Sequence, residues 1–248
     1  MIVFVHGVPE TADIWSGVRE RIGRESIAVA LPGFGNPRPA GFGATKDDYV
    51  DWLLGELDRV DGPIDLVGHD WGAGFTLRVA TAHGDRLRSW AADVANIAHP
   101  DYVWHQIAQV WQTPGDGEAF VDGQNQVSAE DRAAGLEGFG VPRGGAMEMA
   151  VASDADMGSC ILDLYRSAVP NPHHDWGPLA PTHAPGLVLH ATDDPFGDEA
   201  QQREVADALG AGFASIAGAG HFWPYQTPDA GAATLTAFWD GLDQRTAP

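Results

Sequence analysis

The stretch LVGHDWGAGF, residues 66–75, decides the fold that we expect for this chain. Its first three residues have the apolar character of a buried strand, and its last four have the glycine spacing of a helix start. Asp70 lies at the apex of the turn, between Gly68 and Gly72. A side chain at either glycine position would clash with the adjoining strand or helix. The pattern G-x-D-x-G predicts a tight strand–turn–helix elbow. Its apex carboxylate lies at the amino end of a helix, where the helix dipole favours an anion.

Short apolar runs alternate with helical patterns on both sides of this elbow. Several of the runs are apolar on both faces, which is typical of parallel strands buried between helices. The strand-like runs are residues 2–5, 26–30, 64–67, 89–94, 187–190 and 213–216, and the clearest helical stripes are residues 13–22, 49–60 and 228–242. Thr45 and Asp48 form a capping box ahead of the second stripe. The alternation predicts an α/β fold with an open, mostly parallel sheet of about six strands.

The alternation stops between His99 and Pro181. This segment has helical patches at residues 103–111, 146–151 and 159–167, with joints rich in Gly and Pro, and no convincing strand. We expect residues 98–183 to form a helical cap over the carboxyl ends of the strands, where open α/β sheets bind ligands. Residues 1–97 and 184–248 would then form the core. The run from His173 to Asp175 lacks a second ligand cluster at useful spacing, so no metal site is expected.

Composition narrows the class of protein and its partners. The formal charge of −21 over 248 residues argues against nucleic acid and anionic membranes as partners. No stretch approaches the roughly 20 apolar residues of a membrane span, and the N-terminus lacks the basic region of a signal peptide. Cys160 is the single cysteine, which excludes an intramolecular disulfide and fits a cytoplasmic location. We expect it to be a small core residue.

Three further elements accompany the elbow. Val8 lies in the loop after the first strand, in the run VHGVP; Asp193 and Asp194 end the fifth strand, in HATDDPFGD; and His221 follows the last strand, in AGAGHFWP. The order of nucleophile, acid and histidine is that of the α/β-hydrolases. In that class the backbone N–H groups of Val8 and Trp71 would form the oxyanion hole.

The combination of HGVP, PGFG (Pro32–Gly35), GHDWG and GAGHF resembles the α/β-hydrolases that use an Asp nucleophile, namely epoxide hydrolases and haloalkane dehalogenases. The resemblance covers most of residues 2–97 and 184–242. It implies a core with a helical cap, no cofactor and a covalent alkyl-enzyme ester. A carboxylate attacks carbonyls poorly but is suited to displacing a leaving group at saturated carbon, which explains Asp70. His221, oriented by Asp194, would then activate water against the ester.

The family's pattern of an acid followed directly by Pro favours Asp194 over Asp193. Asp193 and Asp198 would then be solvated loop charges. Some dehalogenases carry the acid after the preceding strand, and Asp93 near that strand is the alternative. His6 is expected to support its loop through hydrogen bonds.

The cap residues bear on the substrate. Tyr165-Arg166 resembles the site of the second tyrosine that donates to the epoxide oxygen in epoxide hydrolases. The first tyrosine is expected near Ile107, where Tyr102 and His105 are the nearest substitutes. Trp71 occurs in both enzyme classes and does not separate them.

Halide binding needs a second donor that the sequence does not supply clearly. Val8 stands where dehalogenases have a halide-binding Asn, so the donor would have to be one of the cap tryptophans: Trp104, Trp111 or Trp176. The run HGVPE is closer to epoxide hydrolases. The prediction is therefore hydrolysis of a small-to-medium apolar epoxide to a diol, with haloalkane dehalogenation as the alternative.

Two other classes remain open: a hydrolase or lyase that uses Asp70 differently, and an inactive α/β-hydrolase fold that serves as a binding protein. Met1 stands one residue before the first strand, so the sheet would lack the antiparallel edge that the family usually has. Either this is a shortened member or the start is misassigned, and the exposed edge would suit a homodimer contact.

Overall fold

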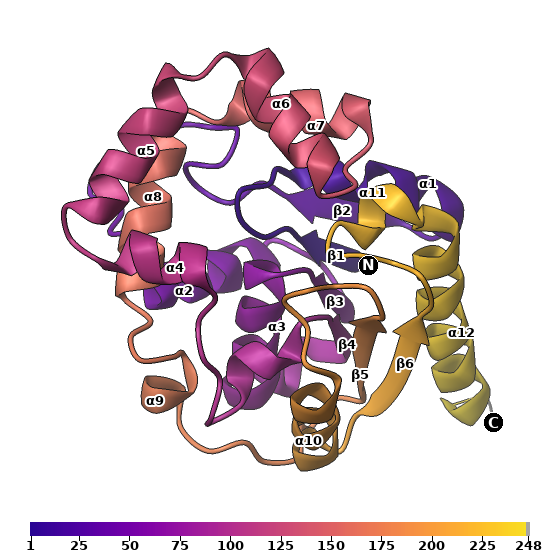
Figure 1. The fold of residues 1–248 in the computed structure, drawn as a ribbon. Coiled ribbons are helices and arrows are strands. Elements are labelled where there is room, and N and C mark those ends of the chain that lie inside the picture. The colour runs from indigo at the N-terminus through magenta and orange to yellow at the C-terminus, as the bar shows by residue number, and fades with distance from the viewer. Residues whose placement is uncertain (247–248) are drawn as a thin grey trace.

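A computed structural model describes residues 1–246 as one six-stranded sheet covered by helices (Figure 1). The strands are β1 (Ile2–Val5), β2 (Ser26–Val29), β3 (Ile64–Gly68), β4 (Leu87–Ala92), β5 (Gly186–Ala191) and β6 (Gly212–Ile216). Their order is β2-β1-β3-β4-β5-β6, and every neighbouring pair is parallel. The predicted α/β class and six-stranded parallel sheet are therefore confirmed.

Two apolar clusters lie on opposite faces of the sheet, because successive side chains of a strand point in opposite directions. Val3 and Val5 of β1 join the cluster under α2 (Lys46–Leu57), α3 (Trp71–Ala82) and α10 (Glu199–Leu209). Ile2 and Phe4 join the cluster under α1 (Ser16–Ile22) and α12 (Pro228–Thr246). The register pairs Val5 with Gly68, so the loop after β1 and the elbow after β3 leave the sheet side by side.

Several boundaries differ from the sequence prediction. The stripe at residues 13–22 is divided, because a 3-10 turn, η1 (Ala12–Trp15), precedes α1. The capping box of Thr45 and Asp48 is present, with its helix beginning at Lys46. Asp198 is exposed, as expected, and its side chain also accepts a hydrogen bond from the backbone N–H of Gln201 and caps α10.

The segment between β4 and β5 is helical throughout its regular structure, as far as residues 1–246 are described. Two short 3-10 turns flank β4: η2 (Gly84–Arg86) precedes it and η3 (Ala95–Ala98) follows it. The helices of this segment come after η3. They are α4 (Gln106–Gln112), α5 (Asp116–Gln126), α6 (Ala129–Gly138), α7 (Arg143–Ala152), α8 (Ala155–Arg166) and α9 (His173–Trp176). Figure 1 shows α4–α8 as an arch to one side of the sheet.

The predicted helical patches of this segment fall in α4, α7 and α8, but α5 and α6 were not predicted. The sequences of these two helices are polar and contain internal glycines, so no apolar stripe announces them. Cys160 of α8 is fully buried in the core, as expected. Among residues 1–246, no helix combines the length and the apolar character needed to cross a membrane.

Candidate active site

The predicted elbow joins β3 to α3 through a strained residue. Asp70 has φ 52° and ψ −122°, a conformation that non-glycine residues adopt rarely and that recurs at functional sites. A Cβ atom on Gly68 would lie 2.1 Å from the carbonyl oxygen of Gly72, and one on Gly72 would lie 2.3 Å from the carbonyl oxygen of Val5. Side chains at either position are therefore excluded by backbone, and the Asp70 carboxylate is held at the apex.

The Asp70 carboxylate is gripped by backbone donors. Its Oδ1 accepts a hydrogen bond from the N–H of Val8 at 2.8 Å, and the adjacent N–H of Trp71 lowers the pKa of the carboxyl and so favours its ionised form. The side chain is only 18% exposed. Burial raises the pKa of Asp70 to about 6, although the nearby His221 opposes the rise. The two N–H groups predicted for the oxyanion hole thus both lie at this carboxylate.

His221 lies between Asp194 and Asp70. Nδ1 of His221 lies 3.0 Å from Oδ2 of Asp194, and its Nε2 lies 3.8 Å from Oδ2 of Asp70. Asp194 also accepts a hydrogen bond from the N–H of Phe196 at 2.8 Å. Burial lowers the pKa of His221, but the hydrogen bond and charge of Asp194 outweigh it and leave that pKa raised. The structure brings these three predicted residues together.

Asp93, the alternative acid, faces a different histidine. Its carboxylate contacts Nδ1 of His69 at 2.5 Å and accepts a hydrogen bond from Nε1 of Trp223 at 2.6 Å. It also accepts from the backbone N–H of Asp70 at 2.9 Å, so it supports the elbow from below. Asp194, and not Asp93, is the carboxylate that contacts His221.

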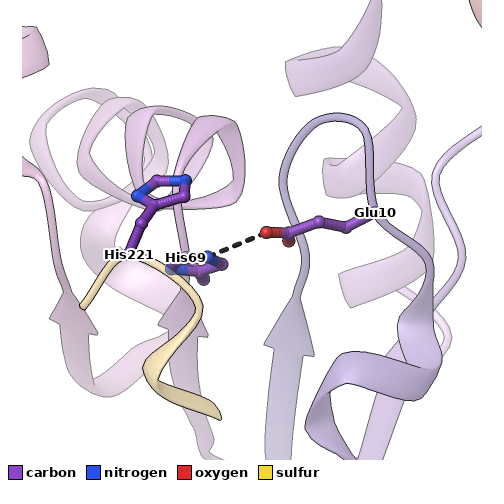
Figure 2. Close-up of side chains that lie close together, drawn as sticks. All are labelled: Glu10, His69 and His221. Carbon is purple, nitrogen blue, oxygen red and sulfur yellow. Dashed lines mark ion pairs between the residues drawn. The ribbon is translucent and has the colours of Figure 1, made fainter. Parts of the chain in front are cut away.

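Sequence reasoning missed a buried ion-pair cluster beneath the elbow. Nε2 of His69 lies 2.9 Å from Oε1 of Glu10, and Figure 2 shows this pair beside His221. Although burial favours neutral imidazole, the carboxylates of Asp93 and Glu10 raise the pKa of His69 well above its usual range. The ring centroid of His69 lies 4.9 Å from that of His221, so His69 is next to the predicted catalytic residues. A positive charge on His69 favours the ionised form of Asp70. The Glu in HGVPE was the only sequence signal for this cluster.

Glu10, His69 and His221 are also the only group among the described residues whose ligand atoms lie close enough to hold a metal ion, within 4.8 Å of one another. Their contacts differ from a metal site, because both nitrogens of His69 face carboxylates and Nδ1 of His221 faces Asp194. The His173–Asp175 run lies outside this group. His6 supports its loop, since its Nε2 accepts from the N–H of Leu31.

A largely apolar cavity of about 340 Å³ opens above Asp70 and His221. Three of the four residues predicted to bind substrate, Tyr102, Tyr165 and His105, line it, whereas the fourth, Trp71, is fully buried and packs against Trp104 and Tyr165. Burial, followed by the charge of Asp70, raises the pKa of both tyrosines, which places their hydroxyls in the field of that carboxylate.

The aromatic wall of the cavity is closely packed. Trp104 stacks on Trp71 with ring centroids 5.4 Å apart and contacts Tyr165 at 5.0 Å. Nδ1 of His105 accepts a hydrogen bond from the backbone N–H of Ala108 at 3.2 Å. Burial and then the charge of His221 lower the pKa of His105 to about 4, so the ring is neutral at pH 7 and carries its proton on Nε2.

The indole N–H groups of Trp71, Trp104 and Trp176 differ in their hydrogen bonds. Nε1 of Trp71 is buried and has no partner other than the neighbouring Tyr165. Nε1 of Trp104 donates to the carbonyl oxygen of Ala168 at 3.0 Å, and Nε1 of Trp176 donates to Asp47 at 2.8 Å. Two of the three cap tryptophans considered as halide donors are therefore already engaged.

A model of the Alpha/beta hydrolase family matches residues 2–234 of the chain. Among curated proteins, haloalkane dehalogenase of Agrobacterium fabrum is 31% identical over 142 residues, which cover 52% of this chain and 45% of that protein. Epoxide hydrolase 2 of Siraitia grosvenorii is 32% identical over 99 residues, which cover 36% of this chain and 30% of that protein. The matches thus span less than half the length of these relatives.

The fold has close counterparts among solved structures. The loop variant DbeA-M1 of haloalkane dehalogenase from Bradyrhizobium elkanii superposes with a TM-score of 0.74 and 19% identity, covering 100% of this chain and 91% of that one. At this identity the likeness concerns the fold alone.

Proposed function

The chain belongs to the alpha/beta hydrolase family, and we propose that it hydrolyses epoxides to diols through a covalent ester on Asp70. The observation that carries this proposal is the pair of tyrosines, Tyr102 and Tyr165, that share an apolar cavity with the Asp70 carboxylate. The cavity fits a small-to-medium apolar electrophile.

In the first step, Oδ2 of Asp70 attacks an epoxide carbon and forms the ester bond. The carbon–oxygen bond of the ring breaks, and the electron pair stays on the epoxide oxygen, which takes a proton from Tyr165 or Tyr102. The hydrogen bond from Val8 holds Oδ1 and so turns Oδ2 toward the cavity and His221. This step needs Asp70 ionised, which the positive charge on His69 favours.

In the second step, His221 takes a proton from water, and the resulting hydroxide attacks the carbonyl carbon of the ester. The oxyanion forms on Oδ1, against the N–H groups of Val8 and Trp71. The tetrahedral species collapses, the ester oxygen leaves with the product, and His221 returns the proton to it. Asp70, now a carboxylic acid that carries the solvent oxygen, gives its proton to the tyrosinate left by the first step, and both residues regain their starting forms. Because the negative charge of Asp70 raises the pKa of His221, esterification lowers that pKa and favours the neutral base.

We also propose that residues 98–183 act as a cap that supplies the proton donors and the walls of the cavity. Tyr102, His105 and Tyr165 come from this segment, whereas Asp70, Asp194 and His221 come from loops at the strand ends. The division assigns bond breaking to the core and substrate selection to the cap.

Haloalkane dehalogenation is the second candidate, and it is supported by the buried Nε1 of Trp71, which has no partner other than the neighbouring Tyr165. A halide released beside Asp70 needs such a donor. Val8 has no side-chain donor, and the N–H groups of Trp104 and Trp176 are engaged, which leaves Trp111, a residue that lines the cavity, as the one cap tryptophan for this role. We therefore place epoxide hydrolysis first.

The test is intact-protein mass spectrometry of a His221→Gln variant mixed with terminal and aryl epoxides or with short haloalkanes. We expect Asp70 to gain the full mass of an epoxide, because ring opening expels nothing, whereas a haloalkane adduct would lack its halogen. A His183→Gln variant, altered at an exposed histidine, should turn over normally. If peptides containing Asp70 stay unmodified with both substrate classes, the proposal is wrong.

A further inference from the structure

The short helix α11 (Trp223–Gln226), which follows His221, is fixed in the core. Trp223 is fully buried, and its Nε1 donates to Asp93 at 2.6 Å. The ring packs so closely on α12 that a Cβ on Gly231 would lie 2.1 Å from it. Gln226 is at the other end of α11, a helix that cannot move without breaking buried contacts.

The side-chain amide of Gln226 joins two parts of the cavity. Its Oε1 accepts a hydrogen bond from the N–H of Gly220 at 3.0 Å, and Gly220 directly precedes His221. Its Nε2 donates to the carbonyl oxygen of Phe139 at 3.2 Å. Phe139 follows α6 and lines the cavity. One amide thus links the histidine loop, residues 217–221, with the turn between α6 and α7, residues 139–142.

This turn rests directly on α11. Gly140 has φ +83°, and a Cβ there would lie 2.5 Å from Nε2 of Gln226. A Cβ on Gly145 would lie 2.7 Å from the ring of Tyr225, whose hydroxyl donates to Glu148 at 3.2 Å. The glycines permit a close approach that side chains would prevent, so the turn packs on α11, the helix that also contacts the histidine loop.

We propose that Gln226 is a positioning residue that ties the seating of the 139–142 turn to the orientation of His221. This inference rests on the proposed function, in which Asp70 forms the ester and His221 removes it. A change at Gln226 should then act on ester hydrolysis through Gly220 and on substrate retention through Phe139. Ester formation, which needs only Asp70 and the tyrosines, should be spared.

Two substitutions separate the two hydrogen bonds. Gln226→Met keeps the size of the side chain and removes both bonds, whereas Gln226→Glu keeps the acceptor for Gly220 and removes the donor to Phe139. In single-turnover experiments with an epoxide, we expect Gln226→Met to slow ester hydrolysis about tenfold and to change ester formation by less than about twofold. Gln226→Glu should restore hydrolysis to within about twofold of the wild type while raising KM about fivefold.

A variant on the other side of the contact provides an independent check. Gly140→Ala places a methyl group against Nε2 of Gln226 and so displaces the amide that also bonds Gly220; it should raise KM and slow ester hydrolysis, as Gln226→Met does. Gln244→Met, altered at an exposed glutamine of α12, serves as the control and should behave as the wild type. Thermal denaturation of each variant shows whether the fold is retained.

Hydrogen exchange separates failure of this inference from failure of the proposed function. In Gln226→Met we expect faster amide exchange in both residues 139–145 and residues 217–221, whether or not an ester forms. Unchanged exchange in both segments, or an equal slowing of ester formation and hydrolysis, would overturn the inference. If the wild type forms no ester while exchange changes as expected, the proposed function fails and the link through Gln226 stands.

Discussion

The floor and the roof of the cavity are built in different ways. The floor, around Asp70, is fixed by backbone contacts that admit only glycine and by ion pairs among fully buried side chains such as His69 and Glu10. The roof, residues 98–183, exposes apolar side chains along α5–α7 and their joints: Val151 is 68% exposed and Phe139 is 55% exposed. Under the proposed function, the reacting groups are therefore fixed by the core, whereas the walls of the cavity can vary without disturbing them.

The roof is joined largely through main-chain carbonyls. Arg132 of α6 donates to the carbonyl oxygens of Gln124 and Val127 at the end of α5 and to that of Ala150 in α7. Such bonds do not depend on the side chains of the acceptor residues. Substitutions on α5 and α7 can therefore reshape the cavity without breaking the bundle.

Replacement of the floor nucleophile should give the largest effect. Asp70→Asn removes the attacking carboxylate, and we expect turnover to fall by about 10⁴-fold. The assay is diol formation in freshly purified protein, with peptide mass spectrometry to exclude deamidation back to Asp. Asp193→Asn, a change at an exposed carboxylate of the same loop as Asp194, should leave turnover intact. Full activity in verified Asp70→Asn would remove the basis of the proposed function.

Removal of a roof hydroxyl should cost less. Tyr165→Phe deletes a proton donor but keeps the packing against Trp71 and Trp104, so ester formation from an epoxide should slow by about 10²-fold. Tyr102→Phe should slow it by about tenfold, because the second hydroxyl remains. Rapid-quench measurement of the ester separates this step from hydrolysis. Unaltered ester formation in both variants would favour a leaving group that needs no proton.

The pH dependence of kcat/KM should follow the ionisation of Asp70 in the floor and should not change with substitutions in the roof. Burial raises the pKa of Asp70 to about 6, and attack needs the ionised carboxylate, so kcat/KM should be constant above that pH and fall below it. The expected limit is about a tenfold loss per pH unit on the acid side. Phe139→Ala in the roof should keep the same midpoint, since its ring carries no titrating group. A profile that stays flat down to pH 4 would contradict an essential carboxylate of this pKa.

Substitutions in the floor and in the roof should also differ in their effect on the free energy of unfolding. Leu66 of β3 is fully buried, and Leu66→Ala should cost about 2–5 kcal/mol of unfolding free energy. Phe139→Ala should change it by less than about 0.5 kcal/mol, because half of that ring already meets water. Urea denaturation measures both. Comparable losses would show that the roof is part of the same packed core.

The same division explains which features sequence analysis predicted. The elbow, the apolar runs that form the strands and the positions of Asp194 and His221 follow from local patterns. Steric exclusion at Gly68, for example, depends on Gly72, a residue close in sequence. The cluster of Glu10, His69 and Asp93 joins three distant segments, and no local pattern encodes such a meeting. The sheet register that brings β1, β3 and β4 together produces it.

The roof was less predictable for a second reason. Helices α5 and α6 bury little apolar surface, so they lack the periodic stripe on which helix prediction depends. Tyr102 precedes α4 in an irregular stretch, and its place in the cavity depends on tertiary packing, including its ring contact with Trp104 at 5.0 Å. Residues that face a ligand from irregular chain leave no spacing to read.

The bond between the N–H of Val8 and Oδ1 of Asp70 makes the two oxygens of one carboxylate chemically distinct. Under the proposed function, the product carries away Oδ2, and a solvent oxygen replaces it, so the enzyme renews one of its own atoms in every cycle. Repeated turnover in heavy-oxygen water would then label Asp70 once if Val8 prevents rotation of the carboxylate, and twice if the group spins between cycles. The isotope content of a single side chain would thus record how firmly a backbone amide holds it.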